Sequence, residues 1–158
     1  MKLNYKDIWL KNSQLPWCLL VTTGRAGTDF FQSLLDSHPE IFGYNGTLYF
    51  HSIWGSSISV VGRGKVNLND FLDEFIGENL SAFKSYYDTE ERKEQLGKNR
   101  NEYIDIDTQE FREHVIGLLE GEDITSKNVI VAIYIAYALS LGQDISAKRI
   151  FFHHPHHV

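Results

Sequence analysis

The residues from Gly24 to Thr28 combine the properties of a turn that binds an anion. Gly24 and Gly27 have no side chain to obstruct an approaching oxygen, and both can adopt positive φ angles. Arg25 supplies a fixed charge and a two-pronged donor for phosphate or sulfate. Thr28 adds a hydroxyl group where a helix is expected to begin, and the first N–H groups of a helix have no partner within it. Together these groups predict binding of a phosphate or sulfate group.

Two common nucleotide-binding signatures do not fit this turn. A triphosphatase loop has four residues between its glycines, followed by Lys and then Ser or Thr, which hold the outer phosphates and magnesium. Here Gly24 and Gly27 are only three positions apart, and no lysine follows. A dinucleotide-binding fingerprint begins with G-x-G, which this turn also lacks. A tight turn without a ligand is the plain alternative, and the charged side chain of Arg25 argues against it.

The chain around this turn has the pattern of a strand followed by a helix. Residues 16–23 are apolar and β-leaning, which predicts a buried strand of a parallel sheet. Apolar residues then recur at helical spacing over residues 28–35, and His38-Pro39 ends that run. Residues 148–152 predict a second buried strand that runs directly into HHPHHV. The expected fold class is therefore α/β with a central parallel sheet.

The rest of the chain is expected to be helical between irregular segments. Residues 41–66 are rich in glycine and aromatic side chains, which predicts loops and short strands rather than a long helix. Residues 82–107 predict an exposed insertion, because their charged centre holds few apolar residues. The apolar run over residues 129–141 is shorter than the roughly 20 residues of a membrane span, so it predicts a buried helix. Helices are expected over residues 67–80, 108–119 and 126–141.

Composition describes one globular domain over residues 1–158. A formal net charge of -6 repels polyanions, which argues against a nucleic-acid partner. The N-terminal segment holds no signal-peptide core, and the single cysteine, Cys18, cannot form an internal disulfide. Both observations favour a cytoplasmic location. Cys18 lies in an apolar run, where we expect it to pack as a small hydrophobic side chain.

Histidines supply two further candidate groups. His51, in the segment LYFHSIW, has the chemistry of a general base, and the alternative is a structural histidine among aromatic rings. Of the seven histidines, four lie between His153 and His157, and such a tract can bind zinc or nickel. Neighbouring histidines at one strand end rarely converge on a metal ion, so we expect adventitious binding and no resident metal.

The stretch TTGRAGTDFFQSLLDSHPEI, residues 22–41, resembles the 5′-phosphosulfate-binding element of sulfotransferases that use 3′-phosphoadenosine 5′-phosphosulfate (PAPS). The resemblance is to the bacterial branch, with a G-R-x-G-[ST] loop followed by L-L-D-x-H-P-E. It implies a P-loop-like three-layer sandwich around the parallel sheet. It also implies that Arg25 and the helix terminus stabilise the leaving oxygen during in-line sulfuryl transfer, which makes Arg25 a candidate catalytic residue. The residues that it implies for binding the phosphosulfate are Gly24, Arg25, Ala26, Gly27, Thr28 and Asp29.

The family has a second cofactor element, a strand that ends in an arginine-containing motif near the 3′-phosphate. Residues 148–152 and the following HHPH resemble this place, which implies that His153 and His156 contact the 3′-phosphate where arginines are usual. A later serine of the family would lie beyond Val158. The resemblance therefore implies the N-terminal part of a larger domain, truncated at its C-terminus.

The implied reaction is sulfuryl transfer from PAPS, without a metal, to a hydroxyl or amine group of a small-molecule or glycan acceptor. Some branches have a catalytic glutamate after the H-P pair, but no carboxylate occurs here between Glu40 and Lys65. His51 is therefore the candidate base. A non-catalytic nucleotide- or anion-binding module of the same fold is the alternative, favoured by Asp29 and by the histidines in place of arginines. A kinase of this fold is a third possibility, against which the absent G-K-[ST] argues.

Overall fold

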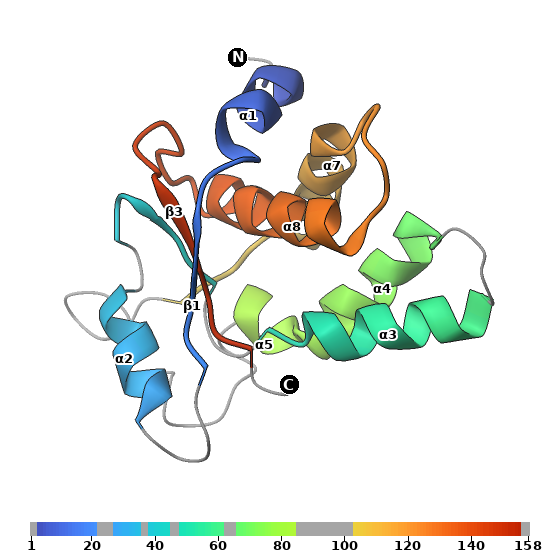
Figure 1. Cartoon of the computed structure of the whole chain (residues 1–158), viewed down its shortest axis with the longest axis horizontal. Coiled ribbons are helices and arrows are strands. Elements are labelled where there is room, and N and C mark those ends of the chain that lie inside the picture. The colour runs from blue at the N-terminus through green and yellow to red at the C-terminus, as the bar shows by residue number, and fades with distance from the viewer. Residues whose placement is uncertain are drawn as a thin grey trace.

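Strands from the two ends of the chain lie side by side in a small parallel sheet (Figure 1). The computed structural model describes residues 3–21, 27–35, 38–44, 48–61, 66–84 and 103–155. These residues form a mixed α/β structure with seven helices and one three-stranded sheet. The strands are β1 (Trp17–Leu19), β2 (Ile41–Phe42) and β3 (Ile150–His153). The helices are α1 (Tyr5–Asn12), α2 (Thr28–Leu35), α3 (Phe50–Val61), α4 (Leu68–Glu78), α5 (Leu80–Phe83), α7 (Thr108–Leu118) and α8 (Ser126–Ser140).

The last strand, β3, occupies the centre of the sheet and runs parallel to β1 and β2 on either side. Cys18 pairs with Phe152, and Phe42 pairs with Phe151. Phe151 and Phe152 are buried. The second buried strand expected from the sequence is therefore confirmed, and so are the α/β class and the parallel sheet.

β1 is an edge strand, which corrects the buried strand expected over residues 16–23. Among the described residues β1 pairs with β3 on one side only. Trp17 is half-buried, while Cys18 and Leu19 are exposed. The expectation that Cys18 packs as a small hydrophobic side chain is therefore wrong. An apolar run indicates a strand, but burial depends on how many neighbours cover it.

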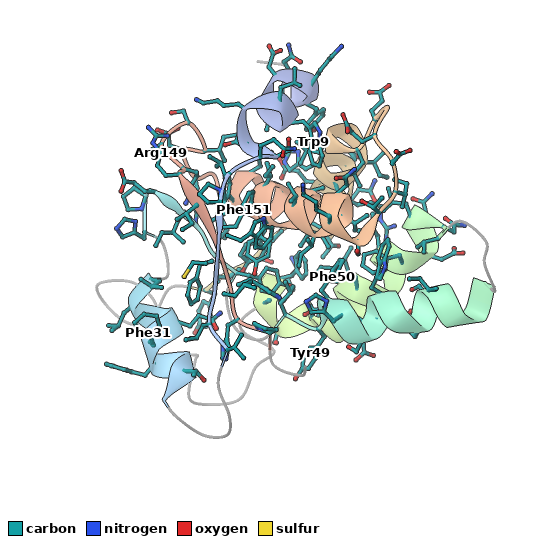
Figure 2. The ribbon with its side chains drawn as sticks, in the orientation of Figure 1. Trp9, Phe31, Tyr49, Phe50, Arg149 and Phe151 are labelled. Carbon is teal, nitrogen blue, oxygen red and sulfur yellow. The ribbon has the colours of Figure 1, made fainter. Side chains whose placement is uncertain are left out.

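Helices α2 and α8 cover opposite faces of the sheet (Figure 1). Successive side chains of a strand point to opposite faces. Accordingly the Phe151 ring lies 6.0 Å from the ring of Tyr134 in α8, and the Phe152 ring lies 6.2 Å from the ring of Phe31 in α2. Figure 2 shows Phe31 on α2, apart from Phe151 in the sheet. Both faces of β3 are thus packed against a helix.

Helix α2 confirms the helix expected after the turn, yet much of its apolar face is exposed. Phe30 is 71% exposed and Leu34 is 61% exposed. Phe31 of this face contacts the sheet through Phe152. Helical spacing is a local property of the sequence, whereas burial of the apolar face requires another surface that covers it. The three-stranded sheet of the described residues is narrow, so it leaves much of this face uncovered.

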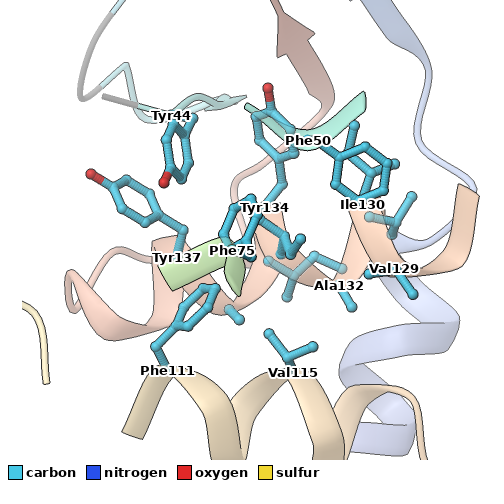
Figure 3. Close-up of a cluster of buried hydrophobic side chains, with 14 of the residues drawn as sticks. Tyr44, Phe50, Phe75, Phe111, Val115, Val129, Ile130, Ala132, Tyr134 and Tyr137 are labelled. Carbon is cyan, nitrogen blue, oxygen red and sulfur yellow. The ribbon is translucent and has the colours of Figure 1, made fainter. Parts of the chain in front are cut away.

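Helix α8 lies at the centre of the core (Figure 3). Its residues from Val129 to Ala138 are all buried, which confirms the buried helix expected there. Thr125 begins the helix, because its hydroxyl oxygen accepts the N–H of Asn128. No helix of the described residues is both long and apolar enough to cross a membrane.

Aromatic rings that follow β2 or belong to α4, α5, α7 and α8 pack together in the core (Figure 3). The rings of Tyr44 and Tyr137 have centroids 4.5 Å apart, and those of Phe83 and Phe111 have centroids 4.7 Å apart. Phe75 packs between them, with its centroid 6.4 Å from Phe83 and from Phe111. Each such pair contributes roughly 0.5–1.5 kcal/mol beyond the burial of its surface. The cluster joins α4, α5, α7 and α8, and it confirms the helices expected near residues 67–80 and 108–119.

Helix α3 corrects the loops and short strands expected for residues 41–66, although β2 is indeed a short strand. Glycine, serine and β-branched residues give this segment a low intrinsic helix propensity. Phe50 is buried against α4, and packing of this kind outweighs local propensity. The hydroxyl groups of Ser56 and Ser57 donate to the carbonyl oxygen of Ile53 at 2.8 and 2.9 Å, so both side chains find a partner within α3.

Of the insertion expected over residues 82–107, residues 85–102 lie outside the described residues. At its two ends, Phe83 and Ile106 are buried. Lys84 and Asp105 form an antiparallel bridge through their backbones and an ion pair through their side chains.

Candidate functional site

The carboxyl ends of β1 and β3 lie at the same end of the sheet, close to the start of α2 (Figure 1). We call this end of the sheet the carboxyl edge. The N–H of Leu20 donates to the carbonyl oxygen of His153 at 2.9 Å, which continues the pairing beyond β1. Helix α2 then begins at Thr28. In open parallel sheets, ligands bind at this carboxyl edge. The described parts of both candidate elements, the start of α2 and the end of β3, therefore lie at this carboxyl edge (Figure 1).

Gly27 ends the turn in the left-handed conformation, with φ of 72°. Its carbonyl oxygen accepts the N–H of Phe31 at 3.1 Å, so Gly27 is the residue just before α2 that accepts the first hydrogen bond of the helix. A non-glycine residue is strained at this φ. Thr28 is half-buried, and Asp29 belongs to α2 by its backbone. The predicted residues Gly24, Arg25 and Ala26 and the side chain of Asp29 lie outside the described residues.

The structure brings together two candidates that are far apart in the sequence, His51 of α3 and His153 of β3. Their Nε2 atoms lie 3.2 Å apart, within hydrogen-bond distance. The ring centroids are 5.4 Å apart, so the two imidazoles meet nitrogen-first rather than face to face. His153 is buried, whereas His51 is exposed. One partner thus belongs to the core, and the other is open to solvent.

The second ring nitrogen of His153 is also engaged. Its Nδ1 lies 2.9 Å from the hydroxyl oxygen of Tyr134, a buried residue of α8. The Trp17 ring packs against the His153 ring with its centroid 6.2 Å away. Burial, with smaller contributions from His51 and His154, lowers the pKa of His153 to about 4. His153 is therefore neutral at neutral pH, and both of its nitrogens have partners within the protein.

His154 points to the opposite face of the sheet, toward α2. Its Nδ1 lies 3.0 Å from Oε1 of Gln32, and Nε2 of Gln32 donates to the carbonyl oxygen of Tyr44 at 2.7 Å. Because Oε1 can only accept, Nδ1 of His154 is the donor in this pair. Gln32 therefore links the carboxyl end of β3, helix α2 and the residues after β2.

The contacts of His153 bear on the binding of the 3′-phosphate that the resemblance implies for His153 and His156. A neutral imidazole with both nitrogens engaged is a weak partner for a phosphate group. His153 therefore forms hydrogen bonds with Tyr134 and His51 at the carboxyl edge, and it supplies no positive charge there. His156 lies outside the described residues. Within the part of the chain that the structure describes, no three His, Cys, Asp or Glu side chains come together as a metal site would require.

Sequence reasoning did not identify Tyr134 or Gln32 as part of this edge. Tyr134 lies in the apolar run of α8, where its ring is one of many buried side chains. Side chains alternate between the two faces of a strand, so the sequence does predict that His153 and His154 point to opposite faces of the sheet. The helix that each face would meet is not visible in the sequence.

Comparison of the chain with protein-family models, with curated proteins and with solved structures finds no match.

Proposed function

We propose that the chain is a PAPS-dependent sulfotransferase domain that binds the 5′-phosphosulfate group at the turn between β1 and α2. In this proposal the sheet and its flanking helices belong to a P-loop-like three-layer sandwich. The observation that carries the proposal is the position of α2 in residues 22–41, the segment that resembles the family. There, Gly27 at positive φ leads into a helix at the carboxyl edge of a parallel sheet.

The chemistry that the turn would supply is electrostatic. In sulfuryl transfer, the bond between sulfur and the bridging phosphate oxygen breaks while a bond forms between sulfur and the acceptor oxygen or nitrogen. Negative charge develops on the leaving adenosine 3′,5′-bisphosphate. Arg25 and the first N–H groups of α2 would stabilise that charge. The acceptor group loses a proton in the same step, to Nδ1 of His51 where that nitrogen is bare and otherwise to solvent water.

His51 supports the proposal because it is exposed to solvent and contacts His153 at the same carboxyl edge. Its Nε2 faces His153, so Nδ1 is the nitrogen left for a ligand. If Nδ1 is unprotonated, His51 can accept the acceptor's proton. If Nδ1 carries a proton, His51 donates a hydrogen bond to an oxygen of the transferred group.

Calorimetric titration of the chain with adenosine 3′,5′-bisphosphate tests the proposal. We expect binding that weakens by about 1.5–3 kcal/mol in Arg25→Ala, because a charge-assisted contact is lost. Arg149→Ala is the matched control. Arg149 lies just before the amino end of β3, at the opposite edge of the sheet (Figure 2), and contacts the carbonyl oxygens of Ser146 and Lys148. No binding by the unaltered chain, or equal binding by the two variants, would overturn the proposal.

Transfer assays with hydroxyl and amine acceptors separate an enzyme from a binding module. An enzyme yields sulfated acceptor and adenosine 3′,5′-bisphosphate in equal amounts. A chain that binds the nucleotide and transfers nothing to any acceptor supports the non-catalytic module of the same fold.

A further inference from the structure

Three side chains form one hydrogen-bonded chain that runs from the core to the surface. The Tyr134 hydroxyl lies 2.9 Å from Nδ1 of His153, and Nε2 of His153 lies 3.2 Å from Nε2 of His51. Tyr134 and His153 are buried and His51 is exposed. A change of proton position at the buried end therefore reaches the surface through two contacts.

The hydrogen bonds among Tyr134, His153 and His51 can run in either of two directions. A neutral imidazole has one N–H donor and one nitrogen acceptor, so each contact can hold one proton only. If Tyr134 donates to His153, then His153 carries its proton on Nε2 and donates to His51. His51 then carries its own proton on Nδ1. If His153 donates to Tyr134 instead, every proton is reversed, and Nδ1 of His51 is a bare acceptor.

The burial of Tyr134 decides between these directions. In the reversed direction the phenolic proton of Tyr134 needs another acceptor, and a buried donor without a partner is costly. Among the described residues, Nδ1 of His153 is the partner of this hydroxyl. Burial also raises the pKa of Tyr134, so its proton is retained. The lowered pKa of His153, about 4, keeps that ring neutral, with one N–H donor and one nitrogen acceptor.

We propose that Tyr134 donates to His153 and that His153 donates to His51, so that His51 presents an N–H donor at Nδ1. Tyr134 is then a positioning residue, because it sets the tautomer of a surface histidine through a second histidine. The ligand suited to this donor is an oxygen of a phosphate or sulfuryl group. This assignment replaces the role of general base that the sequence suggested for His51. Only the identity of the anion rests on the proposed function.

The tautomers can be measured directly by long-range proton–nitrogen correlation NMR of the ¹⁵N-labelled chain at neutral pH. We expect the proton on Nδ1 in His51 and on Nε2 in His153. His38 is an internal reference, because its Nδ1 accepts the N–H of Glu40 at 3.2 Å and its proton must therefore lie on Nε2. A proton on Nε2 of His51 in the unaltered chain would overturn the proposal.

Tyr134→Phe tests whether the buried hydroxyl group sets the tautomer of His51. We expect the ratio of the Nδ1–H to the Nε2–H form of His51 to fall on the order of tenfold. Tyr137→Phe is the matched control, because Tyr137 is also buried in α8 but donates to the carbonyl oxygen of Ala82 at 2.8 Å. It should leave the ratio unchanged. An equal response to both substitutions, or no response to Tyr134→Phe, contradicts the proposal.

The donor role is tested by PAPS binding to His51→Asn and His51→Ala. Asparagine keeps an N–H donor near the place of Nδ1 but cannot act as a base. We expect affinity within about threefold of the unaltered chain for asparagine and a loss on the order of tenfold for alanine. Equal affinities of the two variants contradict the donor role. If the unaltered protein does not bind PAPS, the proposed function fails. The tautomer measurement still decides the direction of the hydrogen bonds from Tyr134 through His153 to His51.

Discussion

The ammonium group of Lys148 donates to the carbonyl oxygen of Ile41 at 2.7 Å. It also donates to the carbonyl oxygen of His38 at 3.2 Å and to Oε1 of Gln143 at 2.7 Å. Lys148 is only 3% exposed. One buried cation therefore joins the start of the central strand β3 to the start of its neighbour β2.

Replacing Lys148 should destabilise the sheet. Lys148→Met keeps much of the apolar stem but leaves the acceptors at His38, Ile41 and Gln143 without this donor. We expect the free energy of unfolding to fall by about 2–4 kcal/mol in urea titrations. Lys127→Met, at an exposed position of α8, is the control and should change it by less than about 0.5 kcal/mol. Equal small effects in the two variants would show that the Lys148 contacts do not support the sheet.

The lowered pKa of His153 should make stability depend on pH. The unfolded chain takes up a proton near pH 6.5, whereas the folded chain remains neutral at this site down to about pH 4. The free energy of unfolding therefore falls as the pH falls from 6.5 to 4, on the order of 2–3 kcal/mol from this group. His153→Gln removes that contribution. In urea titrations between pH 7 and 4.5, the unaltered chain should lose more stability than the variant, and parallel losses would contradict the assignment.

Two glycines inside helices should respond to alanine in opposite directions. A Cβ at Gly117 of α7 would lie 2.5 Å from the Tyr5 ring, so Gly117→Ala should displace α1 and cost about 1–3 kcal/mol. At Gly55 of α3 nothing lies within 4 Å of the added Cβ. Gly55→Ala should stabilise the chain by roughly 0.5–1 kcal/mol through helix propensity. Thermal unfolding of both variants measures the difference, and a Gly117→Ala variant as stable as the unaltered chain or more stable would argue against the close contact of α1 and α7.

The turn before α2 should require glycine at position 27. Gly27→Ala adds a Cβ that meets no atom within 4 Å, so the effect comes from the φ of 72° alone. We expect a loss of about 1 kcal/mol in the free energy of unfolding. Gly27→Asn should cost less, because asparagine tolerates the left-handed region. Gly43→Ala is the control, at an open position without positive φ. Stability equal to that of the unaltered chain in all three variants would contradict the positive φ.

The exposure of Cys18 should be visible in its reactivity. A thiol reagent such as Ellman's reagent should modify one cysteine in the folded chain, at a rate within about tenfold of that in denaturant. Cys18→Ser is the control and should give no reaction. Complete protection in the folded state would restore the burial that the sequence suggested.

The local elements were largely predictable, because helical and strand patterns are carried by contiguous residues. The helices over α2, α7 and α8 and the strand β3 follow from such patterns. Helix α3 was missed, because it owes its stability to packing on α4 rather than to its own glycine- and serine-rich composition. Burial was predicted correctly where neighbours lie on both sides, as at β3, and wrongly at the edge strand β1.

The sequence by itself determined which residue types follow one another at residues 24–28, and it predicted the strand before them and the helix after them, because such patterns depend on adjacent residues. Only the tertiary structure decided that His51, His153 and Tyr134 share one chain of hydrogen bonds. His51 is 102 positions from His153, and Tyr134 is 19 positions from it. The last strand inserts between the first two, and α8 packs on one of its faces. Contacts between segments so distant depend on how sheet and helices pack, and no local pattern of residues specifies them.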